Sequence, residues 1–185
     1  MRIAIVGAGR MGKWFASYFR KHVVKLYDKG DSLNELPSFD AIILAVSLNQ
    51  MRKIVLKIRK IVKPSQLVWD IASVKSFFIK EFRKLNCRKA SVHPMFGPSA
   101  HSMKDQNVVL ISDVGSKRNQ KEVAKLFRGA RITRLTARKH DEVMAFVLCL
   151  PYLINFAFND LTRNKFNSFA GPTFGNQKQL AEKIL

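Results

Sequence analysis

The first half of the chain alternates between short apolar runs and amphipathic stretches. Apolar and β-branched residues fill Arg2–Val6 and Val23–Tyr27, and between them Lys13–Lys21 carries its aromatic residues at helical spacing. Asp40–Ser47 is almost continuously apolar, which is typical of a parallel strand buried on both faces. Only residues 29–39 break the alternation, because they are too few for a crossover helix and another strand. The pattern predicts parallel β-α-β units.

The alternation continues beyond this point. We expect helices over Asn49–Val62, Ser76–Leu85 and Lys117–Phe127, and strands over Gln66–Ile71, Lys89–Val92, Asn107–Ser112 and Arg131–Leu135. From Lys139 the spacing becomes helical, and one face collects Val143, Phe146, Val147, Leu150, Ile154, Ala157, Phe158 and Leu161. We therefore predict an α/β fold, a Rossmann-type doubly wound and mostly parallel sheet over residues 1–138. A short all-helical region over residues 139–185 should follow it.

A glycine-rich turn joins the first predicted strand to the first predicted helix. In Gly7-Ala8-Gly9-Arg10-Met11-Gly12, Gly7 suits a tight turn, Gly9 lets the backbone approach a pyrophosphate, and Gly12 lets the helix pack on the strand. The free amides and the dipole of the helix N-terminus would face the phosphates. This context, strand then glycines then helix, predicts a dinucleotide site.

An acidic residue stands where such a site needs one. Asp28 ends the second predicted strand, 21 positions after Gly7, and would accept hydrogen bonds from the adenosine ribose. Its charge repels a 2′-phosphate and favours NAD, while Lys29 beside it weakens that preference and leaves NADP as an alternative. The candidate cofactor-binding residues are Gly7, Gly9, Arg10, Met11, Gly12, Asp28 and Val46.

Two polar side chains follow neighbouring predicted strands. In His93-Pro94-Met95-Phe96-Gly97-Pro98 the prolines lack amide donors and Gly97 permits positive φ, so the strand should stop and hold His93 at its rim. Ser73 follows the preceding strand, at the same edge as the glycine turn. A neutral imidazole there can take a proton from a substrate hydroxyl while its carbon gives up a hydride. Ser73 would orient either partner, or would serve only as a helix cap.

The composition is globular but strongly basic. The 185 residues are 47% hydrophobic and 25% charged, and 33 Lys and Arg against 13 Asp and Glu give a net charge of +20. Such a field attracts nucleic acid, acidic membranes or small polyanions. In Met51–Lys63 the basic residues alternate with apolar ones, as on the solvated face of an amphipathic helix. Because no nucleic-acid-binding motif accompanies them, the sequence favours a basic surface over a nucleic-acid site.

Other targeting and metal signals are weak. The longest apolar runs, Ala41–Val46 and Ala145–Pro151, are shorter than a bilayer span, and the N-terminus enters a strand directly. Cys87 and Cys149 lie far apart and lack metal-ligand spacing, so two reduced, structurally incidental thiols are expected. We predict a cytoplasmic protein with no membrane contact and no metal site.

Several segments together resemble prephenate dehydrogenases, most closely the archaeal form. They are Met11–Phe15, Asp70–Lys75, His93–Ser99, Lys104–Leu110, Lys139–Val143, Leu150–Pro151 and Gly171–Phe174. The resemblance covers nearly the whole chain, and the His93–Pro98 string is its most specific part. It implies NAD(P)-dependent oxidation of prephenate to 4-hydroxyphenylpyruvate with loss of carbon dioxide, in tyrosine biosynthesis.

The resemblance also implies roles for individual residues. His93 would deprotonate the hydroxyl on ring carbon C4 while hydride leaves that carbon, and Ser73 would hydrogen-bond the same hydroxyl. The implied substrate-binding set is Ser73, Lys75, His93 and Gly97. Because aromatisation of the ring makes decarboxylation downhill, the reaction requires no metal and no covalent nucleophile.

The chain departs from bacterial members in its helical region. Cys149 and Tyr152 stand on the stretch where those members carry histidines, and Gln179 replaces the arginine that grips a substrate carboxylate. Lys75, Arg163, Lys178 or a partner chain would then have to supply the cation for the dicarboxylate. A long helix with a wide apolar face predicts a homodimer through residues 143–185, with Gln177–Leu185 read as a helix still in progress. Arogenate dehydrogenase and a non-catalytic NAD-binding paralogue are the alternatives.

Overall fold

The computed structural model describes residues 1–163 and 165–184. The chain divides into two compact units, Met1–Asp141 and Glu142–Leu185. The division falls close to residue 138, where the spacing of apolar residues changes from the α/β pattern to a helical one.

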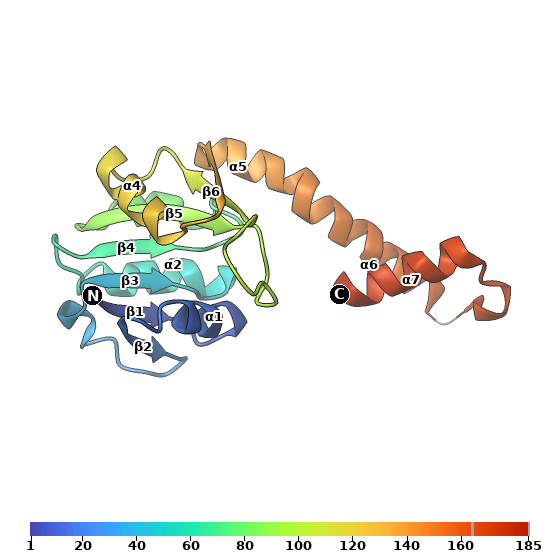
Figure 1. Ribbon diagram of the computed structural model, residues 1–185, viewed down its shortest axis with the longest axis horizontal. Helices are drawn as coiled ribbons and strands as arrows, with labels where there is room; N and C mark the ends of the chain where they lie inside the picture. The colour runs from blue at the N-terminus through green and yellow to red at the C-terminus, as the bar shows by residue number, and fades with distance from the viewer. Residues whose placement is uncertain (164, 185) are drawn as a thin grey trace. The chain divides into compact units, whose positions relative to one another are not determined.

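The first unit is built on a seven-stranded sheet with the order β2-β1-β3-β4-β5-β6-β7 (Figure 1). The strands are β1 Arg2–Val6, β2 Val23–Tyr27, β3 Ala41–Leu44, β4 Leu67–Asp70, β5 Arg88–Pro94, β6 Asn107–Ile111 and β7 Arg131–Leu135. Every neighbouring pair is parallel except β5 and β6. The predicted doubly wound, mostly parallel sheet is confirmed.

Helices cover both faces of this sheet. The helices α1 (Arg10–Tyr18) and α4 (Lys117–Leu126) contribute to one buried cluster, and α2 (Leu48–Ile58) and α3 (Ile79–Arg83) contribute to the other. Between β2 and β3 there is only a 3-10 turn, η1 (Leu36–Ser38). The strands β2 and β3 flank β1 on opposite sides, so the strand order reverses between β1 and β3.

Strand β5 runs further than the sequence predicts. His93 and Pro94 pair with Val109 and Val108 of β6, whereas β4 pairs with β5 only as far as Ser91. The amide of Met95 donates to Asn107 in β6, so the alternation of a strand places the Pro94 nitrogen on the β4 side. The expectation that the strand stops before Pro94 was wrong. Pro94 lacks an amide hydrogen only on the side of β4, where the pairing with β5 has already ended at Ser91.

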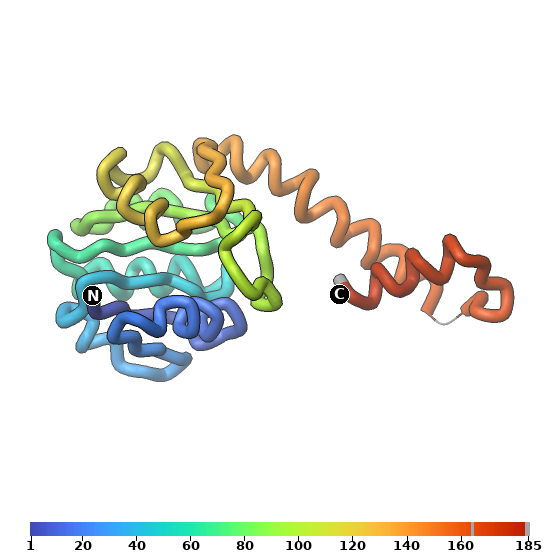
Figure 2. Tube along the Cα trace, viewed as in Figure 1, coloured from blue at the N-terminus to red at the C-terminus, as the bar shows by residue number. Residues whose placement is uncertain are grey.

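A long helix leads into the second unit. α5 (Ala137–Met144), a π-helical turn η2 (Ala145–Cys149) and α6 (Leu150–Thr162) are continuous, and η3 (Asn167–Phe169) and α7 (Pro172–Ile184) follow. Pro151 has no amide to donate to the preceding turn, which accounts for the wide turn before it. Within the second unit α7 folds back along α6 (Figure 2), with the rings of Phe158 and Phe174 5.3 Å apart.

The long helix is apolar and exposed. Ala137–Thr162 has 26 residues, its most apolar window has a mean hydropathy of 1.5, and by length and composition it could cross a membrane. Phe146 and Leu161 are each 72% exposed. The length of the uninterrupted apolar runs did not indicate this helix, since uncharged polar residues such as Asn155 interrupt the run without lowering the average much. One such helix is weak support for a membrane span, because an uncovered protein interface has the same composition.

Candidate active site

The glycine turn after β1 has the backbone that a dinucleotide site requires. Gly7 has φ of 115°, and a Cβ there would lie 2.4 Å from the Ala45 carbonyl oxygen. A Cβ on Gly12 would lie 1.8 Å from the Gly7 carbonyl oxygen. A Cβ on Gly9, in contrast, would meet no protein atom within 4 Å. Gly7 and Gly12 thus allow close packing inside the protein, and Gly9 faces open space.

That open space belongs to a cleft of about 570 Å³. Gly7 and Gly9 lie along it, and so do Val46 and Asp28. Gly9 is the N-cap of α1 and makes no side-chain hydrogen bond to the helix, so the first amides of α1 have no side-chain cap. Free amides at a helix N-terminus bind phosphate groups. The cleft therefore fits a dinucleotide whose phosphates lie over Gly9.

The same cleft carries charges of both signs. Asp28 and Asp31 line it together with Lys29, Lys53 and Lys57. Asp28 is held locally: its Oδ1 accepts the Lys29 amide at 2.7 Å, and its own amide donates to Asp31 at 2.7 Å. The carboxylate is thus in place for ribose hydroxyls, in a cleft that lysines also line.

A second cleft, of about 320 Å³, adjoins the first and is called here the substrate cleft. Its lining residues are Met11, Ala45, Val46, Ser47, Leu48, Ile71, Ala72, Ser73, His93, Pro94 and Phe96. Ala45, Val46 and Ser47 line both clefts, so the two meet just after β3, where the strand order reverses. Ser73 and His93 are brought together as predicted. Arg10, Lys75 and Gly97 are not among the described residues that line either cleft.

His93 is the first member of a hydrogen-bonded chain. His93 Nδ1 lies 2.9 Å from His140 Nε2, and His140 Nδ1 lies 2.8 Å from Asp141 Oδ1. The Asp141 carboxylate also accepts the amides of Lys75 at 2.9 Å and Ser76 at 2.8 Å. Asp141 thus caps the turn that precedes α3, and α3 begins at Ile79. The predicted helix Ser76–Leu85 was too long, since the helix spans only Ile79–Arg83.

The hydrogen bonds from His93 through His140 to Asp141 determine which nitrogen of His93 can act as a base. A carboxylate only accepts, so His140 donates from Nδ1 to Asp141 and, when neutral, accepts at Nε2. His93 must then donate from Nδ1, and the lone pair of its ring stays on Nε2. His93 lines the substrate cleft and is 7% exposed. A neutral imidazole with an assigned acceptor nitrogen therefore borders the cleft.

Burial keeps both histidines neutral. Burial, aided by the charge of Lys75 and by His140, lowers the pKa of His93 to about 3. Burial also lowers the pKa of His140, although the hydrogen bond to Asp141 opposes it. Burial alone would raise the pKa of Asp141, but hydrogen bonds from Lys75, His140 and Ser76 outweigh it and lower that pKa. Asp141 is thus the charged end of the chain and His93 the neutral end.

We expect the free energy of unfolding to fall as the pH drops below about 6.5. The pKa of His93 has its ordinary value of 6.5 in the unfolded chain and is lowered to about 3 by burial in the folded protein, so the unfolded chain binds more protons in between. One such proton contributes a slope of about 1.4 kcal/mol per pH unit. His93→Gln should flatten the slope by up to that amount in urea titrations followed by tryptophan fluorescence. An unchanged slope would contradict the assignment, and exposed His22→Gln is the control.

Lys75 lies elsewhere than the resemblance implies. Its side chain is fully buried, and Nζ donates to Asp70 Oδ1 at 2.5 Å and to the Val92 carbonyl at 2.8 Å. Burial lowers the pKa of Lys75, and the Asp70 charge opposes that shift. Both acceptors of the Lys75 ammonium group lie inside the protein, and Lys75 does not line the substrate cleft. It supports the backbone directly before His93.

Sequence reasoning missed three members of this arrangement. His140 reads as an ordinary first-turn residue of a long helix, yet it is fully buried against His93. Asp141 and Asp70 carry no motif beyond their place in the resemblance. A signal was present in the adjacent pair His140-Asp141, because a histidine beside a carboxylate directly after the last strand can reach the end of β5.

The predicted cations of the second unit are engaged there. Arg163 forms an ion pair with Asp160, and Lys178 Nζ lies 3.0 Å from Asn167 Oδ1. Gln179 and Tyr152 are exposed. The lining residues of the substrate cleft, all within the described part of the chain, include no Lys or Arg.

A family model described as prephenate dehydrogenase, nucleotide-binding domain, matches residues 18–133. This chain belongs to that family. The match covers most of the first unit, including Asp28, Ser73 and His93, so the family's nucleotide-binding domain is the α/β unit described above.

Curated relatives agree with this assignment to the prephenate dehydrogenase family. A probable arogenate/prephenate dehydrogenase of Methanocaldococcus jannaschii is 26% identical over 189 residues, covering 87% of this chain and 42% of the relative. The T-protein of Enterobacter agglomerans is 28% identical over 168 residues, covering 84% of this chain and 43% of the relative. The chain thus spans about two fifths of the length of these relatives.

Solved structures of prephenate dehydrogenase family members share the fold. The prephenate dehydrogenase of Aquifex aeolicus, in complex with hydroxyphenyl propionate and NAD⁺, superposes with a TM-score of 0.82 at 21% identity, covering 98% of this chain and 78% of that one. The arogenate dehydrogenase of Synechocystis has a TM-score of 0.78 at 18% identity, covering 100% of this chain and 82% of that one. The predicted family and fold are confirmed.

Proposed function

We propose that this protein is an NAD-dependent prephenate dehydrogenase, which converts prephenate to 4-hydroxyphenylpyruvate and carbon dioxide in tyrosine biosynthesis. The observation that carries the proposal is His93, a neutral base at the point where the substrate cleft meets the cofactor cleft. The names of the relatives support the same reaction class.

In this proposal the residues of one cleft bind the cofactor, and those of the other bind the substrate and accept its proton. The amides at the start of α1 bind the cofactor's phosphates and Asp28 binds the adenosine ribose. When bound, NAD supplies a hydride acceptor. His93 Nε2 accepts the proton of the substrate's C4 hydroxyl as C4 loses hydride, and Ser73 orients that hydroxyl. The bond to the departing carboxylate then breaks, and its electron pair enters the aromatic ring.

The substrate's two carboxylates require positive partners. A carboxylate buried without a cation or hydrogen-bond donors is costly, and the described lining of the substrate cleft holds no Lys or Arg. We propose that Arg163, Lys178 or a residue of a partner chain supplies this charge. Gly97 would then act only through its backbone. Lys75 would act only by supporting the backbone beside His93.

The test is to follow NADH formation with prephenate and with arogenate side by side. Prephenate turnover supports the proposal, and turnover of arogenate alone would replace it with arogenate dehydrogenase. That alternative draws on the relatives whose names include arogenate. If the protein binds NAD but neither substrate yields NADH, it is a non-catalytic NAD-binding paralogue.

Asp28 should set the choice between NAD and NADP. We expect Asp28→Ser to weaken NAD binding and to strengthen NADP binding, because the repulsion of a 2′-phosphate disappears while Lys29 and Lys53 remain. Loss of one repulsive charge contact should shift the ratio of the Kd for NADP to the Kd for NAD by about tenfold. Isothermal titration with both cofactors measures the ratio. Asp40→Ser, outside the lining of the cofactor cleft, is the matched control, and an unchanged ratio in Asp28→Ser would refute the role.

We further propose a cytoplasmic homodimer that uses residues 143–185. The exposed apolar side chains of the long helix form a surface that a second copy would cover. Sedimentation should give a dimer mass, and Leu153→Glu with Leu161→Glu should shift it to a monomer. A monomer mass that does not change with concentration, or sedimentation of the protein with lipid vesicles, would contradict this.

A further inference from the structure

The largest of the clefts described here lies apart from the two that form the candidate active site. It has a volume of about 1060 Å³, against about 570 Å³ for the cofactor cleft. Three segments far apart in sequence border it: residues 14–22 of α1 and its following turn, residues 98–104, and residues 125–129 at the end of α4 and just after it. We call it the basic groove.

The charge of the basic groove has one sign. Five of its lining residues are Lys or Arg and two are His, namely Arg20, Lys21, Lys104, Lys125, Arg128, His22 and His101. Its described lining contains no Asp or Glu, whereas the cofactor cleft sets two carboxylates beside its lysines. A concave surface lined by one sign of charge focuses the field and concentrates anions. The groove is thus suited to an anionic ligand.

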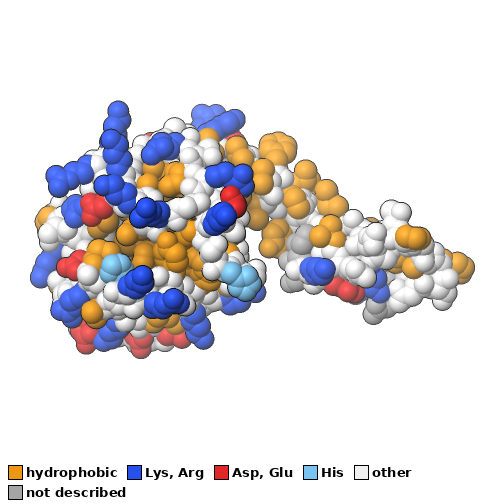
Figure 3. Space-filling model, in the orientation of Figure 1, with side chains coloured by type: hydrophobic (Ala, Val, Ile, Leu, Met, Phe, Trp, Pro, Cys, Tyr) orange, Lys and Arg blue, Asp and Glu red, His pale blue; other side chains and the backbone are white. Residues whose placement is uncertain are grey.

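Aromatic rings form part of the groove between these cations. Trp14 and Tyr18 stack with centroids 5.3 Å apart and planes 9° apart. Trp14 Nε1 donates to the Ala100 carbonyl and the Tyr18 hydroxyl donates to the Leu126 carbonyl, so both polar atoms are already satisfied by the protein. Figure 3 shows a hollow with hydrophobic side chains on its floor and Lys, Arg and His around it. Both rings are half-buried, which leaves ring surface for a planar ligand.

The positive surface continues beyond the groove along α4. Lys125 also lines the neighbouring concavity, together with Lys117, Arg118, Lys121 and Glu122. From Lys117 to Lys125 the helix rises about 12 Å, at 1.5 Å per residue. Cations therefore extend from the groove over a length that one small anion cannot occupy. This extension favours a linear polyanion.

We propose that the basic groove binds single-stranded nucleic acid, with phosphates along the lysines and arginines and bases against Trp14 and Tyr18. A positive groove with aromatic residues is how proteins hold single strands without reading their sequence. The cations are scattered in the sequence, so the composition alone favoured a basic surface over a nucleic-acid site. The fold brings them together from three segments. The inference is independent of the proposed dehydrogenase activity.

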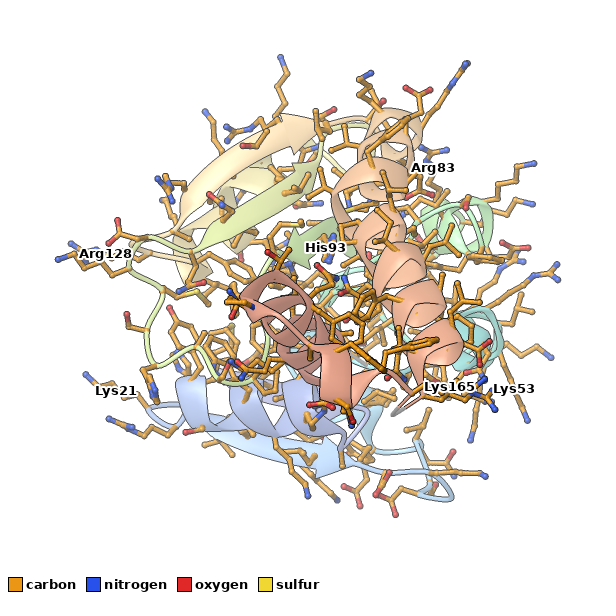
Figure 4. The ribbon with its side chains drawn as sticks, turned by 90° about the vertical axis from the view of Figure 1, so that its right-hand side faces the viewer. Lys21, Lys53, Arg83, His93, Arg128 and Lys165 are labelled. Carbon is orange, nitrogen blue, oxygen red and sulfur yellow. The ribbon has the colours of Figure 1, made fainter. Side chains whose placement is uncertain are left out.

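The test compares two triple variants that remove equal charge from opposite faces. Lys21→Ser, Lys104→Ser and Arg128→Ser empty the groove rim; Arg59→Ser, Lys60→Ser and Lys84→Ser are the control on the side of α2 and α3. All six side chains are exposed, so both variants should fold. Figure 4 shows Lys21 and Arg128 projecting on one side, and Lys53 of α2 and Arg83 of α3 on the other.

Binding of a labelled mixed-sequence RNA of about 12 nucleotides is measured by fluorescence anisotropy across a salt series. We expect the groove variant to bind at least about tenfold more weakly and its slope of log Kd against log salt to fall by about 2, from 0.7 per lost phosphate contact. The control variant should stay within about twofold of the parent protein. Equal weakening in both variants would overturn the proposal, since net charge alone would then explain binding.

Two further measurements address the bases. In a Trp69→Phe background Trp14 is the remaining tryptophan, and its emission should be quenched by RNA but not by inorganic polyphosphate of equal charge. The single strand should also bind more tightly than a duplex of the same sequence. Equal binding of polyphosphate, or preference for the duplex, would refute a single-strand site.

Discussion

Replacement of His93 by asparagine is expected to lower kcat with prephenate by about 10²- to 10⁴-fold, while the Kd for NAD stays the same. The loss follows from the hydrogen-bonded chain: Asp141 orients His140, His140 holds the Nδ1 proton of His93, and Nε2 is left as the acceptor. Asparagine keeps a donor for His140 but has no ring nitrogen to take the substrate's proton. His93 lines the substrate cleft and not the cofactor cleft, so cofactor binding should be spared.

Steady-state NADH formation and a separate NAD titration measure the two quantities. The matched control is His101→Asn, an exposed histidine outside the substrate cleft, which should keep normal kcat. A His93→Asn protein that turns over prephenate at the normal rate would remove His93 from the mechanism. A large loss of NAD affinity would show instead that the substitution disturbs the end of β5.

Replacement of Lys75 by methionine is expected to lower the free energy of unfolding by about 3–5 kcal/mol. The side chain of Lys75 is fully buried and so is that of its partner Asp70, so the substitution leaves a carboxylate inside the protein without its cation. Asp70 Oδ2 already has no hydrogen-bond partner in the described part of the chain. The Val92 carbonyl, next to His93, loses the Lys75 donor at the same time.

The second substitution Asp70→Asn separates charge from packing. If the uncompensated carboxylate causes the loss, the double variant should recover a large part of it, because an amide in that place carries no charge. Urea unfolding followed by tryptophan fluorescence reports on this unit, since Trp14 and Trp69 both lie in it. Exposed Lys80→Met should change the free energy by no more than about 0.5 kcal/mol. A loss below about 1 kcal/mol in Lys75→Met would show that the pair is dispensable.

Most of the fold follows from local patterns. Strand Arg2–Val6, the glycine turn and Val23–Tyr27 each have a strong signal in a few adjacent residues, and the structure places all three as predicted. The errors occur where a distant residue decides the local structure. The ladder with β6, for example, carries β5 through Pro94.

The sequence by itself determined the sheet, the dinucleotide turn and the two residues, Ser73 and His93, that meet in the substrate cleft, because each depends on neighbouring residues and on the common direction of parallel strands. Only the tertiary structure decided what surrounds them. It turned Lys75 inward to Asp70 and set His140 and Asp141 behind His93. It also gathered the basic groove from three segments. The pairing of His93 with His140 and the walls of the groove depend on contacts between distant residues, 47 positions apart for His93 and His140 and 108 for Tyr18 and Leu126, and no local pattern encodes such contacts.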